Sequence, residues 1–149
     1  MKRCHSVLLA IAITPHIIHA APSKLLDAIR WEESRNESHA VNYNKNGTRD
    51  LGPYQLNSAY LDDFRWRYNK GKKINPFSEK EARFISNAHL DRLHNYFLSG
   101  ASDCGATVAS AWYKTVVAWN CGANRYMRGA PQSSRDFAAR VLNRAGMGK

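Results

Sequence analysis

The sequence has few cysteines, no long apolar run and no recognisable cofactor motif. Its 149 residues include only 3 cysteines, and neither their spacing nor the neighbouring histidines match a metal site. Nucleotide-binding and redox motifs are also absent from the sequence, so we expect no metal and no cofactor. The length suits a single domain, without an internal repeat, a low-complexity tract or an interdomain linker.

An apolar stretch near the N-terminus is too short to cross a bilayer. VLLAIAIT follows the basic start MKR and is interrupted at Pro15, whereas a spanning helix needs about 20 residues. Small residues surround Ala20 and Ala21, as at the cleavage site of a secretory signal peptide. The sequence therefore predicts a signal peptide over residues 1–20, export, and no stable membrane span. The alternative is an uncleaved N-terminal anchor.

Acidic residues are outnumbered by basic ones. Residues 1–20 contain two basic residues and no acid, so the rest of the chain has 20 basic and 12 acidic side chains and a formal net charge of +8. This charge favours a polyanionic partner, and predicted export favours the cell envelope over nucleic acid. The segment FRWRYNKGKK, residues 64–73, interleaves aromatic and basic residues as single-strand binders do. We interpret it as a solvated basic loop and expect no nucleic-acid partner.

Two cysteines remain after the predicted signal peptide, Cys104 and Cys121. An exported protein lies in an oxidising compartment, which favours a disulfide. A helix over residues 106–119 would however separate its two ends by about 20 Å. A disulfide needs Cα atoms within about 7 Å, so we expect no bridge between these cysteines unless the helix bends.

Apolar periodicity predicts a mainly helical domain with one small β-hairpin. The expected helices cover residues 23–35, 78–100, 105–122 and 133–144. Ser23 and Ser78 can cap the first two, and Glu81 has capping-box spacing from Ser78.

The helical periodicity of the sequence stops between residues 41 and 57. There, Asn46-Gly47 between polar, strand-like flanks is a strong signal for a tight hairpin turn. Residues 58–77 are expected to form a basic and aromatic connection. The predicted fold class is α+β, mainly α, over one domain at residues 21–149.

The first expected helix ends on a glutamate that its periodicity directs inward. Leu25, Leu26 and Ile29 form one face, and at about 100° per residue Glu33 lies roughly 30° from its centre and Glu32 roughly 70° away. A carboxyl on an apolar face loses hydration, which raises its pKa as a general acid near neutral pH requires. The alternative is that Glu33 only ends the helix or pairs with a neighbouring arginine, Arg30 or Arg35.

Several motifs follow one another in an order known from one superfamily. Glu33-Ser34 is followed by Asn36 and Ala40, and then by NKNGTRDLGPYQLN at residues 44–57. NPFSEKEARFISNAHLDRL, WNCG and PQSSRDFAARVL come later in the chain. From about residue 24 to about residue 144, the chain resembles the lysozyme-like superfamily. It is most similar to the small bacterial lytic transglycosylases with an SLT domain that are associated with secretion and conjugation machines.

The resemblance implies a lysozyme-like fold whose β-hairpin lies beside the catalytic helix. It also implies cleavage of peptidoglycan strands between N-acetylmuramic acid and N-acetylglucosamine, with formation of 1,6-anhydro ends. By position, Glu33 would be the single catalytic acid. The protein would act in the periplasm or cell envelope, with a secretion system or another envelope assembly as a further partner.

Asp50 leaves a second enzymatic alternative open. The same stretch is similar to animal lysozymes, in which the aspartate at this place is the second catalytic carboxylate. Hydrolysis with retention would need the carboxyls of Glu33 and Asp50 about 5 to 5.5 Å apart. Asp50 can instead be a turn residue that accepts hydrogen bonds beside the hairpin, which is the role we favour.

Further site residues follow from the resemblance. Ser34 would bind substrate or support Glu33, while Gln55 and Asn120 would present amides to the sugar. Tyr54 stands where the family has a flexible apolar residue and either lines the cleft or packs in the core.

The chain also departs from the family at Trp119, where a tyrosine hydroxyl usually reaches the catalytic glutamate. Either the indole N–H substitutes, or Tyr113 supplies a hydroxyl, or catalysis is impaired. Pro53, which lacks an amide donor, is another departure. A catalytically impaired peptidoglycan-binding protein is therefore a third alternative.

Overall fold

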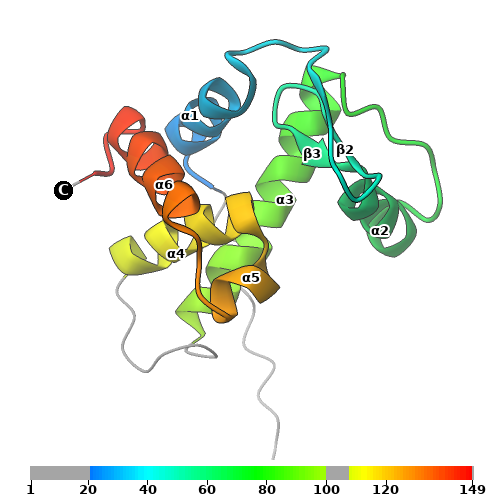
Figure 1. Ribbon diagram of the computed structural model, residues 1–149. Coiled ribbons are helices and arrows are strands. Elements are labelled where there is room, and N and C mark those ends of the chain that lie inside the picture. The colour runs from blue at the N-terminus through cyan, green and yellow to red at the C-terminus, as the bar shows by residue number, and fades with distance from the viewer. Residues whose placement is uncertain (1–20, 100–107, 149) are drawn as a thin grey trace, which may run out of the picture.

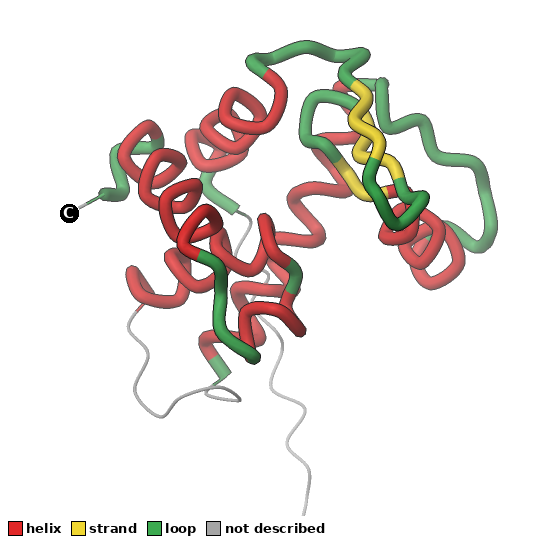
Figure 2. The backbone as a smooth tube through the Cα atoms, in the orientation of Figure 1, coloured by secondary structure: helices red, strands yellow, loops and turns green. Residues whose placement is uncertain are grey.

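The computed structural model describes residues 21–99 and 108–148. The predicted signal peptide and Cys104 lie outside these residues. Six helices and three short strands make up the described part, and most of the polypeptide is helical (Figures 1 and 2). The elements are α1 (Ser23–Ser34), β1 (Val41–Tyr43), β2 (Arg49–Leu51), β3 (Leu56–Asn57), α2 (Ser58–Tyr68), α3 (Glu79–Leu98), α4 (Val108–Cys121), α5 (Ala123–Met127) and α6 (Gln132–Arg144).

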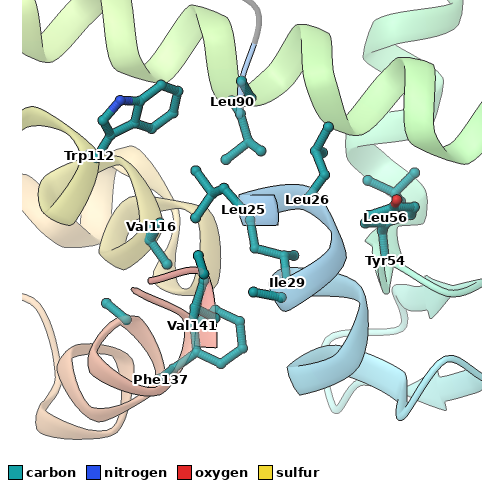
Figure 3. Close-up of a cluster of buried hydrophobic side chains, with 14 of the residues drawn as sticks. Leu25, Leu26, Ile29, Tyr54, Leu56, Leu90, Trp112, Val116, Phe137 and Val141 are labelled. Carbon is teal, nitrogen blue, oxygen red and sulfur yellow. The ribbon is translucent and has the colours of Figure 1, made fainter. Parts of the chain in front are cut away.

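Helices α1, α4 and α6 pack together on one side of the long helix α3, while the sheet and α2 lie toward its other side (Figure 1). The core contains the predicted apolar face of α1, and Leu25 and Ile29 are fully buried there. Val116 of α4 and Val141 of α6 meet that face (Figure 3). Helix α4 is apolar on most sides because it packs against both α3 and α6. Within the described residues, no helix has the length and apolar character needed to span a membrane.

The sheet is antiparallel with the strand order β1-β2-β3. Its first turn is the predicted one: Gly47 has a φ of 81° and its N–H donates to the Asn44 carbonyl. The sequence pattern did not predict β3, because only two residues pair there, with Leu56 opposite Leu51. The α+β, mainly α class is confirmed, and the predicted hairpin is part of a three-stranded sheet.

Residues 58–77 were expected to form a connection, and this expectation is wrong for the first half. Helix α2 begins after Asn57, whose side chain accepts from the Ala59 N–H as an N-cap. Only Leu61 and Phe64 of this helix are buried, so its apolar periodicity is weak in the sequence. The short helix α5 was also not predicted.

Helix caps differ in part from the expected ones. Ser23 does not cap α1, because Pro22 occupies the N-cap position and no side chain caps this end. Ser78 does cap α3 by accepting from the Glu81 N–H. The Glu81 carboxylate accepts from the Asn75 N–H, so it reaches past Ser78 and holds the preceding loop.

Helix α1 ends abruptly after Ser34. Arg35 and Asn36 both adopt left-handed conformations, with φ of 57° and 68°. Left-handed residues commonly end helices, because the chain leaves the helix axis there. The chain then turns toward the sheet (Figure 1), and Glu33 lies in the last turn of α1, just before this change of direction.

Candidate active site

An open pocket of about 540 Å³ brings together residues from most parts of the chain. Glu33 enters it from α1, while Asp50 and Gln55 come from the sheet and its second turn. Trp119 and Asn120 come from the end of α4. Four asparagine and glutamine amides, two carboxylates and one arginine line this pocket, so its wall suits a polar, uncharged ligand. They are Asn44, Gln55, Asn57, Asn120, Glu33, Asp50 and Arg92.

Glu33 has one polar partner among the described residues, and that partner is not a cation. Its Oε1 accepts a hydrogen bond of 2.9 Å from the indole Nε1 of Trp119. Loss of hydration raises the pKa of Glu33 to about 7, the Trp119 hydrogen bond lowers it, and the negative charges of Asp50 and Glu32 raise it. A large fraction of Glu33 is therefore protonated at neutral pH, and the group can both donate and accept a proton.

The adjacent Glu32 has the opposite environment. Only 4% of its side-chain surface is exposed, yet its carboxylate pairs with Arg140 at 3.0 Å and Arg144 at 3.2 Å. Burial alone would raise the pKa of Glu32, but the hydrogen bonds from these two arginines bring it below its usual value.

The local arginines are therefore committed to other carboxylates. Arg35 lies 3.6 Å from Glu32, and Arg30 pairs with Glu79. The alternative in which Glu33 pairs with Arg30 or Arg35 is wrong.

The Trp119 indole of α4 packs against the His89 ring of α3, which in turn packs against the Tyr60 ring of α2. The His89 ring lies 5.3 Å from the Trp119 ring and 4.2 Å from the Tyr60 ring. Burial and the nearby Arg92 lower the pKa of His89 to about 4, so the imidazole is neutral at neutral pH. The sequence analysis singled out neither His89 nor Tyr60 as a site residue. A histidine at an apolar helical position was the one available signal.

Asp50 lies on β2, where Asn57 Nδ2 donates to its Oδ1 at 2.8 Å. It faces the same pocket as Glu33, and its charge acts on the Glu33 pKa. Asp50 therefore lies in a strand and accepts from a side-chain amide, whereas the turn interpretation expected a turn residue that accepts from backbone amides.

The two predicted amide residues both line the pocket, but they differ in how many of their side-chain hydrogen bonds are already made within the protein. Gln55 Nε2 donates to the Gly52 carbonyl at 2.8 Å, and its Oε1 accepts from Asn42. Its amide thus maintains the second turn of the sheet. Asn120 is exposed, and its Oδ1 accepts from the Ser134 hydroxyl at 2.7 Å. Within the described residues its Nδ2 makes no hydrogen bond, so it can donate to a ligand.

Three predicted site residues do not line the pocket. Ser34 donates from Oγ to the carbonyl of Pro53 at 2.9 Å, so it joins the end of α1 to the second turn of the sheet. Tyr54 is fully buried among core side chains (Figure 3), and its hydroxyl accepts from Arg83 at 3.3 Å. It does not line the cleft because its ring fills the space between α1 and the sheet. Tyr113 borders a different cavity, so Trp119 supplies the donor to Glu33.

Cys121 is a free cysteine that lines the pocket, and burial raises the pKa of its thiol. Among residues 21–99 and 108–148, no three His, Cys, Asp or Glu side chains are grouped as metal ligands would be.

The two neighbours of Glu33 should shift its pKa in opposite directions. Trp119→Phe removes a hydrogen bond that stabilises the carboxylate, so the Glu33 pKa should rise above about 7. Asp50→Asn removes a repelling charge, so the pKa should fall. NMR titration of the Glu33 side-chain carboxyl carbon in each variant measures both shifts. Shifts of the same sign would contradict this description of the site.

Comparison with known proteins gives one match. A family model described as the transglycosylase SLT domain matches residues 17–142, which is most of the chain. Searches of curated proteins and of solved structures each found no match.

Proposed function

Since the chain belongs to the transglycosylase SLT domain family, whose members cleave peptidoglycan, we propose that it is a lytic transglycosylase that produces 1,6-anhydro ends. The bond cleaved would be the β-1,4 linkage between N-acetylmuramic acid and N-acetylglucosamine. The observation that carries the proposal is Glu33 itself. It is a half-buried carboxyl with a pKa of about 7, it has no cation partner among the described residues, and it opens into a pocket lined by amides.

The geometry supports a mechanism with one protein carboxyl. Protonated Glu33 donates its proton to the glycosidic oxygen as the C1–O bond breaks. The substrate's 2-acetamido group stabilises the positive charge that develops at C1. The Glu33 carboxylate then takes the proton of the muramyl 6-hydroxyl, whose oxygen attacks C1 and closes the anhydro ring. Because the nucleophile belongs to the substrate, the second carboxylate of ordinary glycosidases is not needed.

The Trp119 departure from the family pattern is compatible with this cycle. The indole N–H occupies a place where a hydroxyl is expected and donates to the same carboxyl. A donor at this position stabilises the carboxylate that remains after proton transfer. This supports an active enzyme over an impaired peptidoglycan-binding protein.

The reaction type can be tested by mass spectrometry of the soluble products released from purified peptidoglycan. Muropeptides that end in 1,6-anhydro-N-acetylmuramic acid are expected. Reducing ends would instead indicate a lysozyme-type hydrolase that uses Glu33 and Asp50. Binding to the wall without any soluble product would indicate a peptidoglycan-binding protein.

Replacement of Asp50 distinguishes the two enzymatic alternatives independently. In a transglycosylase, Asp50→Asn should keep the anhydro product and reduce the rate by no more than about tenfold, because the asparagine can still pair with Asn57. In a retaining hydrolase the same change removes the second carboxylate and should nearly abolish cleavage. The rate of product release, compared with that of wild type, measures the difference.

We also propose that the protein is exported and acts in the periplasm, where it would open the wall locally for a secretion or surface apparatus. The support is the signal-like sequence of residues 1–20 and the family's substrate in the envelope. Fractionation of cells that express the chain with a C-terminal tag tests export. Recovery in the cytosol at full length would contradict it.

A further inference from the structure

A second hollow continues the catalytic pocket along the space between α3 and α5. It has a volume of about 280 Å³ and is bordered by Arg92, Leu93, Tyr96, Ala123, Asn124 and Met127. Three of these residues, Arg92, Leu93 and Ala123, also line the pocket that holds Glu33. The second hollow therefore adjoins the catalytic pocket, and a long ligand seated at Glu33 can extend toward it.

Arg92 stands at the junction of the two cavities and is the one lysine or arginine among the described residues that line them. Its side chain is exposed. Its Nη2 lies 3.4 Å from His89 Nδ1, and its guanidinium lies 5.8 Å from the Tyr60 ring. Both neighbours orient the guanidinium without neutralising it.

Four arginines of α1, α3 and α6 differ from Arg92 in this respect. Arg30, Arg83, Arg140 and Arg144 each pair with a carboxylate. No carboxylate of the described residues lies within ion-pair distance of Arg92, and none borders the second hollow. An oriented guanidinium without a carboxylate partner is suited to bind an anion from a ligand, in particular a carboxylate, which it can hold by two parallel hydrogen bonds.

The rest of the second hollow has apolar and amide character. Tyr96 and Met127 leave 37% and 52% of their surfaces exposed at its border, and Asn124 adds an exposed amide. A peptide with small apolar side chains and carboxyl groups would match these three features. A bare sugar would match the amide but would leave the cation without a partner.

We propose that this second hollow is a subsite for the carboxylate-bearing stem peptide of the substrate, with Arg92 binding a peptide carboxylate and Tyr96 and Met127 contacting its apolar part. The inference rests on the proposed function, because the peptide is attached to the muramyl residue that the catalytic pocket would hold. It assigns to Arg92 a role in the choice of substrate and none in proton transfer.

The test compares three soluble substrates: uncrosslinked strands with stem peptides, the same strands with amidated peptide carboxyls, and strands stripped of peptides by an amidase. Wild-type protein should have the lowest KM for the first. Arg92→Gln should raise that KM by roughly tenfold and bring it close to the values for the other two strands. Arg92→Lys, which keeps the charge, should retain part of the preference.

Arg67→Gln is the matched control. Arg67 is an exposed arginine of α2 that pairs with Asp63 and borders neither cavity, so its loss should leave all three KM values unchanged. The pH profile of cleavage should be the same in Arg92→Gln as in wild type, which separates recognition from damage to the Glu33 site. Circular dichroism checks that each variant is folded.

Two outcomes would overturn the subsite: a wild-type protein that does not distinguish the three strands, or an Arg92→Gln variant that keeps the wild-type preference. The proposed function fails separately, if wild type cleaves none of them. In that case the equilibrium binding of the three strands to Glu33→Gln, with and without Arg92→Gln, still tests the subsite. Equal binding of all strands would reject it.

Discussion

Replacing Glu33 with glutamine is expected to lower the rate of peptidoglycan cleavage by about 10²- to 10⁴-fold. Glutamine keeps the size of the side chain and can still accept from Trp119 Nε1, but it has no acidic proton to donate to the glycosidic oxygen. The measurement is the rate of release of soluble muropeptides at neutral pH. A variant that cleaves at nearly the wild-type rate would remove Glu33 from the mechanism.

Glu37→Gln provides the matched control for this substitution. Glu37 is exposed, lies just beyond the end of α1 and does not line the catalytic pocket. The chemical change is the same, so the control shows how much of any loss comes from changed net charge or from handling. Its rate should equal that of wild type.

The same Glu33→Gln variant should be more stable than wild type at alkaline pH. The pKa of Glu33 rises from 4.5 to about 7 on folding, so its contribution to stability is full below about pH 4.5 and is lost as the pH rises through about 7. At 1.36 kcal/mol per pKa unit, the buried charge costs roughly 3 kcal/mol above that range. Urea unfolding at pH 5 and pH 8 should show a gain for Glu33→Gln mainly at pH 8.

Glu32→Gln should show the opposite effect at pH 8. Glu32 is ionised and held by Arg140 and Arg144, so glutamine at this position leaves two arginines without their partner and should destabilise the fold. A similar change in stability for both variants would contradict the different environments of the two adjacent carboxyls.

Gly52→Ala is expected to reduce the free energy of unfolding by roughly 2 to 4 kcal/mol. Gly52 has a φ of 73°, and a Cβ atom at this position would lie 2.0 Å from the carbonyl oxygen of Pro76 and 2.9 Å from its carbonyl carbon. Both atoms belong to the backbone, so no side chain can move aside to relieve the overlap. Urea unfolding monitored by circular dichroism measures the loss.

Activity should fall with the same substitution, because Gly52 holds the turn that follows β2. Its N–H donates to the Ala40 carbonyl, and its carbonyl accepts from Gln55. Displacement of this turn would move Asp50 and Gln55 on the pocket wall. Cleavage at the wild-type rate by a strongly destabilised but folded variant would show that the turn does not position the site.

Gly47→Ala separates the steric cost from the conformational one. Gly47 has a similar φ of 81°, but an added Cβ would meet no atom within 4 Å. Only the left-handed backbone then opposes alanine, at about 1 kcal/mol. Equal destabilisation by the two substitutions would show that the approach of Gly52 to Pro76 contributes little.

The site residues that the sequence identified well are those whose position depends on local geometry. Helical phase alone directed Glu33 inward, and Asn46-Gly47 alone located the first turn of the sheet. Both features depend on residues within a few positions of one another. The family motifs similarly indicated Asp50, Gln55 and Asn120, which all line the pocket.

Contacts between distant residues had no such signal. Trp119 donates to a carboxyl 86 residues earlier, and no periodicity indicates that this indole, rather than the hydroxyl of Tyr113, reaches Glu33. Helix α2 was missed for a related reason. Only two of its residues are buried, so tertiary packing and the Asn57 cap, rather than an apolar stripe, define it.

The sequence by itself determined the fold class, the inward direction of Glu33 and the first turn of the sheet, because these follow from periods and propensities of neighbouring residues. Tertiary structure alone decided that Glu32 is held by arginines, since Arg140 and Arg144 lie more than 100 residues away in the chain. It also decided that Tyr54 is buried and that Arg92 faces a cavity. Burial and charge pairing depend on which surfaces pack together, and one-dimensional patterns do not record that.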